Sequence, residues 1–123
     1  MANPNILSAT SITGNVTYLA PANTSANTLI SNASSSGTTL KVESLTCANV
    51  TGTAATVTVS VNSAAAGAGT AYRLAYQITV PANASLQVID KNTFVYLTEN
   101  TSIVVTSGTS SAIEYVASYE IIS

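Results

Sequence analysis

The stretch Ala55-Thr-Val-Thr-Val-Ser-Val-Asn-Ser63 alternates between apolar and hydroxyl side chains along its length. Val57, Val59 and Val61 fall on one face, and the intervening Thr and Ser side chains fall on the other. Strict period-two alternation with β-branched residues is typical of a β-strand that is buried on one side only. This stretch therefore predicts a half-buried strand at the centre of the chain.

The same alternation recurs twice. In residues 72–80 it places on the inward face Tyr72, Leu74, Tyr76, Ile78 and Val80. In residues 113–121 it places on the inward face Ile113, Tyr115, Ala117, Tyr119 and Ile121, so that Glu114 and Glu120 share the opposite face. We therefore expect the tyrosines of both strands to pack in the core with their hydroxyls at the rim. The alternative is that the tyrosines form a carbohydrate-binding or receptor-binding platform.

Weaker strand patterns fill the rest of the chain, at residues 6–19 with a break near Gly14, and at 28–31, 41–47, 85–89, 94–97 and 103–106. The alternation slips between Glu43 and Leu45, which indicates either a β-bulge or burial of both faces. Turn-forming residues separate the strands, and the glycine-containing residues 64–69 predict a hairpin loop in preference to a helix. About eight or nine short strands without crossover helices predict an all-β fold, an antiparallel β-sandwich of jelly-roll or immunoglobulin-like type.

The chain length predicts one domain covering residues 1–123. Residues 1–38 are uncharged and weakly patterned, and they allow two interpretations. They either supply the first strands of the sandwich or include an extended N-terminal arm that lies along a neighbouring molecule. A donated strand would cover an otherwise open sheet edge.

The composition is poor in charge: 7% of the residues are charged, 46% are hydrophobic, and the net charge is −2. Before Lys41 there is no charged side chain, and none lies between Glu43 and Arg73. Interface cores are depleted in charge in this way, and a small net charge promotes association. A solvated Ser/Thr surface is the plainer interpretation. We favour homo-oligomeric assembly.

No catalytic residues are predicted. The chain has no histidine, which removes the commonest general base near neutral pH. Glu114 and Glu120 would lie about 20 Å apart on an extended strand, too far apart to act on one bond. Asp90 and Glu99 could approach each other, but no cooperating residue accompanies them. We expect the protein not to be an enzyme.

Cofactor, metal, nucleic-acid and membrane sites are not predicted either. Cys47 is the single cysteine, with apolar neighbours, so we expect it in the core. Gly67-Ala-Gly69 lacks the lysine and helix of a phosphate-binding loop, and three basic residues cannot form a nucleic-acid stripe. Apolar runs are too short for a spanning helix, and the N-terminus has no secretory-signal pattern.

Six Asn-x-Ser/Thr sequons occur, at Asn15, Asn23, Asn32, Asn49, Asn83 and Asn100. Several are expected by chance in a chain so rich in Ser and Thr. We therefore interpret them as a consequence of composition and predict no glycan attachment from them.

Several short motifs resemble a family of small virion proteins from tailed bacteriophages, particularly phages of marine cyanobacteria. They are Asn5-Ile-Leu, Ser11-Ile-Thr-Gly, Val80-Pro-Ala-Asn-Ala-Ser-Leu, Asp90-Lys91, Tyr96-Leu-Thr-Glu-Asn and Val116-Ala-Ser-Tyr-Glu-Ile-Ile-Ser. The resemblance covers most of the chain and implies a β-sandwich structural component of the phage particle, without enzymatic activity.

The resemblance implies a capsid decoration or cement protein that binds the major capsid protein, located in the virion and assembled in the host cytoplasm. The alternative is a structural module of the neck, tail or fibre, or one that binds a host glycan. Copy number per particle would separate the two hypotheses.

Overall fold

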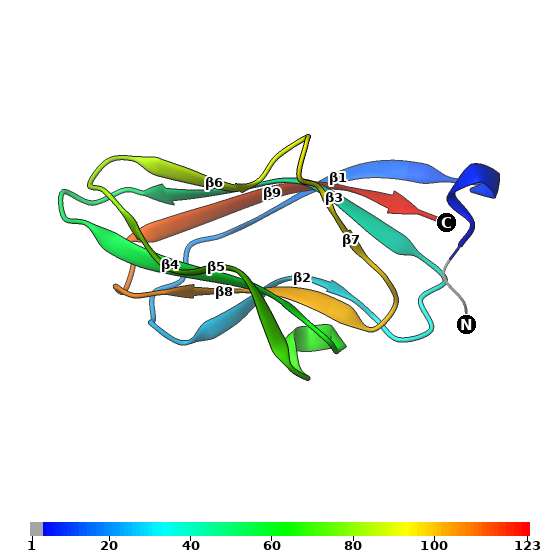
Figure 1. The fold of residues 1–123 in the computed structure, drawn as a ribbon, viewed down its shortest axis with the longest axis horizontal. Coiled ribbons are helices and arrows are strands. Elements are labelled where there is room, and N and C mark those ends of the chain that lie inside the picture. Colours follow the sequence, from blue (N-terminus) through cyan, green and yellow to red (C-terminus); the bar gives the residue numbers. More distant parts are fainter. Residues whose placement is uncertain (1–3) are drawn as a thin grey trace.

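The computed structural model describes residues 4–123 and shows two antiparallel sheets packed face to face (Figure 1). One sheet contains β1 (Ile12–Leu19), β9 (Ile113–Ile122), β3 (Thr39–Asn49), β6 (Ser85–Ile89) and β7 (Val95–Leu97). The other contains β2 (Ala26–Asn32), β8 (Thr101–Ser107), β4 (Ala55–Asn62) and β5 (Ala71–Val80). Two single turns of 3₁₀-helix are η1 (Ile6–Ser8) and η2 (Ala65–Gly67). The predicted all-β antiparallel sandwich of eight or nine strands is confirmed.

The strand order is β1-β9-β3-β6 in the first sheet, with β7 also paired to β3, and β2-β8-β4-β5 in the second. β1 lies beside β2, and β5 lies beside β6. The sandwich therefore has two open sides, one formed by β1 and β2 and the other by β5 and β6. Each of these sides carries sheet edges.

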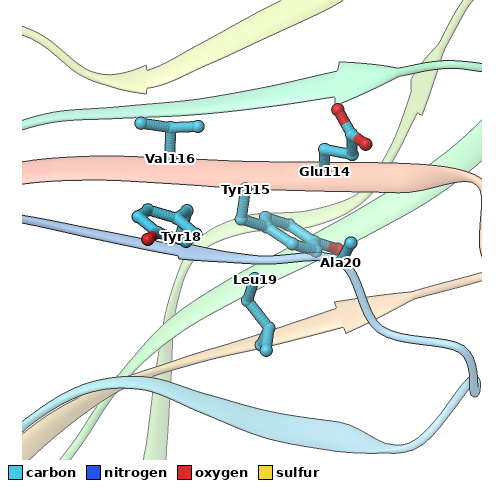
Figure 2. Close-up of a pocket in the computed structure, with 6 residues that line it drawn as sticks. All are labelled: Tyr18, Leu19, Ala20, Glu114, Tyr115 and Val116. Carbon is cyan, nitrogen blue, oxygen red and sulfur yellow. The ribbon is translucent and has the colours of Figure 1, made fainter.

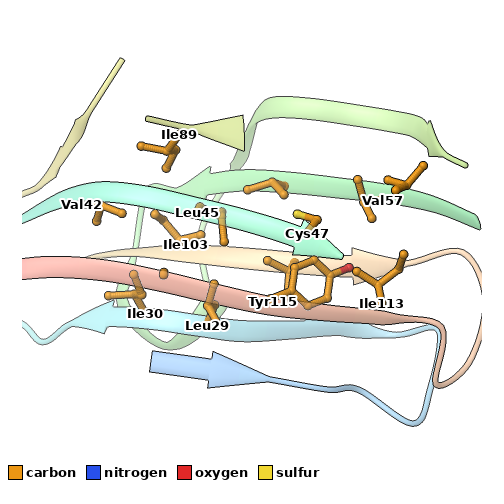
Figure 3. Packing of buried hydrophobic residues seen from close by; sticks show 14 of the residues in the cluster. Leu29, Ile30, Val42, Leu45, Cys47, Val57, Ile89, Ile103, Ile113 and Tyr115 are labelled. Atoms are coloured by element: carbon orange, nitrogen blue, oxygen red, sulfur yellow. The ribbon is translucent and has the colours of Figure 1, made fainter. Parts of the chain in front are cut away.

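The core fills the space between the sheets, where the inward-facing apolar side chains of the two sheets meet. Val57 and Val59 of β4 are fully buried, as their alternation predicts. Figure 3 shows Tyr115 and Cys47 packed in the same layer, and both side chains are 0% exposed. The predicted core position of Cys47 is confirmed.

The slip in β3 is a β-bulge. The register between β3 and β9 shifts between Val42 and Ser44, at the place where the sequence alternation changes parity. Val42 and Leu45 both point into the core as a result and are 0% exposed. The bulge lets one long strand keep its apolar side chains inward across an irregular sequence pattern.

β5 departs from the prediction. Tyr72 and Tyr76, predicted to be core residues, are 65% and 58% exposed, and Leu74 and Ile78 are exposed as well. β5 pairs only with β4 among the described strands, and its register shifts twice. Gln77 adopts a positive φ of 48° near one of these shifts. The bulges break the simple alternation, and the edge position leaves these side chains without a covering layer, so the predicted burial is wrong.

The first part of the chain belongs to both sheets. β1 pairs with β9 through Gly14 without interruption, so the predicted break there is wrong. β2 pairs with β8. Before β1, the backbone N–H groups of Thr10 and Ser11 donate to the carbonyl of Ser123, and Ser123 N–H donates to Ser11, so residues 10 and 11 lie beside residue 123.

The β4–β5 connection folds back over the outer face of its own sheet. Asn62 Nδ2 donates to the Gly67 carbonyl, and Gly67 N–H donates to Ser102 Oγ, both at 3.0 Å. Gly67 has a φ of +76°, and a Cβ there would meet the Thr28 hydroxyl, so this close approach requires glycine. The loop buries Asn62 and Ser102 on what would otherwise be an exposed face. The predicted hairpin loop is confirmed, with one 3₁₀ turn in it.

Two buried asparagines join the two sheets at opposite ends of the sandwich. Asn32, at the end of β2, donates from Nδ2 to the carbonyls of Thr38 and Leu97 (2.9 Å each). Asn49, at the end of β3, donates to the carbonyls of Thr53 (2.8 Å) and Val80 (3.0 Å). Both are 2% exposed. Each side chain ties a sheet-crossing loop to a strand of the opposite sheet, which satisfies carbonyls that strand pairing cannot reach.

Two buried weak acids, the thiol of Cys47 and the hydroxyl of Tyr115, make the free energy of unfolding sensitive to high pH. Burial raises the pKa of the Cys47 thiol from 9.0 to about 12. Burial also raises the pKa of Tyr115 to about 12, although its hydroxyl contact with Ser107 Oγ (2.8 Å) acts in the opposite direction. Both folded-state pKa values exceed the unfolded ones, so the stabilisation is complete below about pH 9 and is lost as the pH rises towards 12.

We expect the free energy of unfolding to fall between pH 9 and pH 11, by up to about 1.4 kcal/mol per pH unit for each group. Urea titrations at pH 8, 9, 10 and 11 would measure this. In Cys47→Ala the fall should begin about one pH unit higher, since only the tyrosine remains. An equal free energy at pH 8 and pH 11 would contradict the prediction.

Candidate functional site

The acidic side chains are dispersed over the surface. Glu114 and Glu120 share the outer face of β9 at opposite ends of the strand, as predicted. Asp90 Oδ1 accepts from the backbone N–H groups of Asn92 (2.8 Å) and Thr93 (3.0 Å), which together with the Thr93 hydroxyl lower the pKa of this exposed carboxyl. Its role is to close a turn. Within residues 4–123, no group of three His, Cys, Asp or Glu side chains could hold a metal ion.

Glu99 has a structural contact with the backbone. Its Oε2 accepts from the backbone N–H of Gly37 at 3.3 Å, so it supports the β2–β3 loop. Asp90 and Glu99 thus each have a local backbone role.

An open apolar cavity of about 350 Å³ lies where β1 ends beside the start of β9 (Figure 2). Its lining residues are Tyr18, Leu19, Ala20, Glu114, Tyr115 and Val116. Strand pairing sets Tyr18 opposite Val116 and Leu19 opposite Tyr115, so two adjacent strands build most of the wall. The charged group in the lining is the carboxylate of Glu114. The volume is at the small end of the range for ligand pockets.

Exposed apolar side chains gather on both open sides of the sandwich. On β5 they are Tyr72, Leu74, Tyr76 and Ile78. On β1 they are Ile12, Val16 and Tyr18, and Tyr18 is 75% exposed. Both are edge strands, and their outer backbone groups have no strand partner among the described residues. An exposed apolar edge strand is a template for pairing with another chain.

Sequence patterns did not identify these edges. Alternation assigned the apolar side chains of β5 to the core, because it shows which residues share a face but not whether anything covers that face. The available signal is Arg73, the only charged residue between Glu43 and Asp90, which lies among the apolar residues of β5.

The sequons fall into two groups. Asn32 and Asn49 are buried and use their amide groups for internal hydrogen bonds, so neither can carry a glycan. The other four, at Asn15, Asn23, Asn83 and Asn100, are exposed or partly exposed. In the described part of the chain, no helix is long and apolar enough to cross a membrane.

Comparison with known proteins gives a structural match. No family model and no curated protein sequence matches the chain. One solved structure, of Bacillus endospore appendages that form disulfide-linked pili, is similar with a TM-score of 0.51 and 15% sequence identity. The match covers 99% of this chain and 95% of that one. At this identity the similarity shows the fold alone.

This match overturns the resemblance to bacteriophage proteins. Capsid decoration, the major capsid protein as partner and a virion location are all wrong, because the near-full-length similarity is to a pilus subunit. The fibre-associated structural role stated as the alternative is closer to this finding, but its phage setting is wrong too. The motifs behind the resemblance lie in η1, at the start of β1, in the β5–β6, β6–β7 and β7–β8 turns, and in β9. They encode strands and turns, which unrelated sandwiches share.

Proposed function

We propose that this protein is a non-enzymatic structural subunit that polymerises with copies of itself into a fibre on a cell or spore surface. The observation that carries the proposal is the pair of apolar edge strands, β1 and β5, on opposite sides of one sandwich. Different surfaces on opposite sides join head to tail, and such contacts build open filaments unless the rotation closes a ring. The similarity to appendages that form pili supports the proposal.

In this proposal residues 1–123 act as one repeating domain. β1 and β2 are paired within their own chain, and residues 10 and 11 bond to Ser123, so the described part of the N-terminal region that is available as an arm is residues 4–9. Leu7 in this part is 97% exposed.

Electron microscopy and sedimentation of the purified full chain test the function. We expect filaments above a critical concentration, and monomers in equilibrium with them. If the wild-type chain stays monomeric up to millimolar concentration, the proposed function is wrong.

We expect residues 1–123 to assemble without disulfides. The described residues contain Cys47 as the single cysteine; it is 0% exposed, and burial raises its pKa to about 12, which keeps it a thiol. A thiolate is needed for disulfide exchange. The fold therefore occurs here without the disulfide links stated for the matching appendages.

We expect the polymers to be unchanged by dithiothreitol, and the chain to run as a monomer on denaturing gels with or without reductant. Matched gel lanes and sedimentation before and after reduction would measure this. A dimer band that disappears on reduction would contradict it.

A further inference from the structure

Arg73 has no ionic partner in the part of the chain that the structure describes. Among residues 4–123 the salt bridge is the one between Lys41 and Glu43, at 3.6 Å. Arg73 is exposed on edge strand β5, and its guanidinium carbon lies 5.3 Å from the centre of the Tyr76 ring. The stacking holds the side chain on the surface while leaving its donors free.

Glu114 is the complementary group. It is exposed on β9 and lines the 350 Å³ cavity, whose lining also includes the exposed Tyr18, the strand partner of Val116. A carboxylate next to aromatic and aliphatic walls suits a guanidinium, which is planar, weakly hydrated and able to stack while it donates hydrogen bonds. An ammonium group, being compact and strongly hydrated, fits such a cavity less well.

Arg73 and Glu114 cannot meet within one molecule. β5 lies on one open side of the sandwich, and the cavity lies on the other, between β1 and β9. Their positions along the strands differ as well. Arg73 pairs with Ser60 near the β4–β5 hairpin, whereas the hydroxyl of Tyr115 in the cavity wall contacts Ser107, which pairs with Val57 towards the other end of β4.

We propose that Arg73 of one copy inserts into the cavity of the next copy, stacks on Tyr18 and pairs with the carboxylate of Glu114. This inference rests on the proposed polymer and specifies the contact that joins its subunits. Arg73 and the cavity lie on different surfaces of the subunit, so the contact repeats from copy to copy. The pair fixes the register between subunits whose facing edges are otherwise uncharged.

Reversing the charge at Arg73 or at Glu114 tests the proposed contact between them. Arg73→Glu sets two carboxylates against each other in every contact, and Glu114→Arg sets two guanidinium groups against each other. We expect each variant to raise the critical concentration for assembly at least about 100-fold, as measured by sedimentation and light scattering. Both sites are exposed, so the thermal unfolding temperature should stay close to that of the wild type.

The decisive measurement is whether assembly returns when opposite charges are paired again. In an equimolar mixture of the two variants, every contact between unlike subunits regains an opposite-charge pair, so alternating polymers should form near the wild-type critical concentration. The double variant, with both substitutions in one chain, should assemble alone. Lys91→Glu and Glu120→Arg are matched controls that change the net charge equally, and they should assemble normally.

The outcomes separate the two proposals. If wild type assembles but the mixture and the double variant do not, or if the controls fail as badly as the variants, the Arg73–Glu114 contact is wrong and the polymer stands. If wild type itself does not assemble, the proposed function is wrong.

Discussion

Replacing Asn49 with alanine is expected to lower the free energy of unfolding by about 3 kcal/mol. The Asn49 amide donates to two carbonyls, and its Oδ1 accepts from Thr51 N–H (3.0 Å) and from the Thr51 hydroxyl (2.7 Å). Alanine removes all four hydrogen bonds and leaves the Val80 carbonyl without this donor in a buried position, which is more costly than losing an exposed contact.

A second substitution separates hydrogen bonding from volume. Asn49→Asp keeps the acceptor for Thr51 but presents a charged oxygen to the carbonyls of Thr53 and Val80. It should be at least as destabilising as alanine at pH 7, and less so at pH 4, where the carboxyl can be protonated and donate one bond. Urea unfolding monitored by tyrosine fluorescence measures both. Asn92→Ala, in an exposed turn, is the control and should change stability by less than about 0.5 kcal/mol. Equal stability of Asn49→Ala and Asn92→Ala would refute the role of the buried amide.

Replacing Tyr72 with lysine is expected to raise the critical concentration for assembly about 100-fold while leaving the fold intact. Tyr72 is 65% exposed on the β5 edge, so the monomer loses little packing. In the proposed polymer this edge faces the next copy, and a lysine there must either give up its hydration or keep the copies apart. A cost of about 3 kcal/mol per contact corresponds to about a 100-fold rise in the critical concentration.

Thr53→Lys is the matched control, because it adds the same charge at an exposed turn residue outside both edge strands. Sedimentation should show monomers for Tyr72→Lys at concentrations at which wild type and Thr53→Lys form filaments. Thermal unfolding of the three proteins should differ by only a few degrees. Filaments of Tyr72→Lys at the wild-type critical concentration would exclude β5 from the interface.

The sequence predicted the fold class because alternation is a local property. Residues 55–63 and 113–121 carry their pattern in the order of side chains alone, and both became strands with the predicted inward faces: Val57 and Val59 are buried, as are Ile113 and Tyr115. The slip near Glu43 was equally local, and the bulge follows it.

The edge position of β5 could not be predicted, because strand order depends on contacts between distant segments. Tyr72 to Val80 has the same alternation as a covered strand, and nothing nearby in sequence shows that, among the described strands, it pairs with β4 alone. The cavity is hidden for the same reason: Tyr18 and Glu114 are far apart in sequence and become neighbours when β1 pairs with β9. The burial of Asn32 and Asn49 could not be predicted either, because the chain contains many other polar residues.

The adjacency of residues 10 and 11 to residue 123 has a mechanical consequence. β1 and β9 are antiparallel neighbours whose outer ends lie together, so a force that pulled these two ends apart would peel β1 from β9 one residue pair at a time. A polymer joined through β1 and β5 would carry its tension differently, crosswise through the strand ladders of both sheets, so that many hydrogen bonds share the load at once. In such a fibre the tension would not act in the direction that peels β1 from β9, which is the direction in which the subunit is weakest.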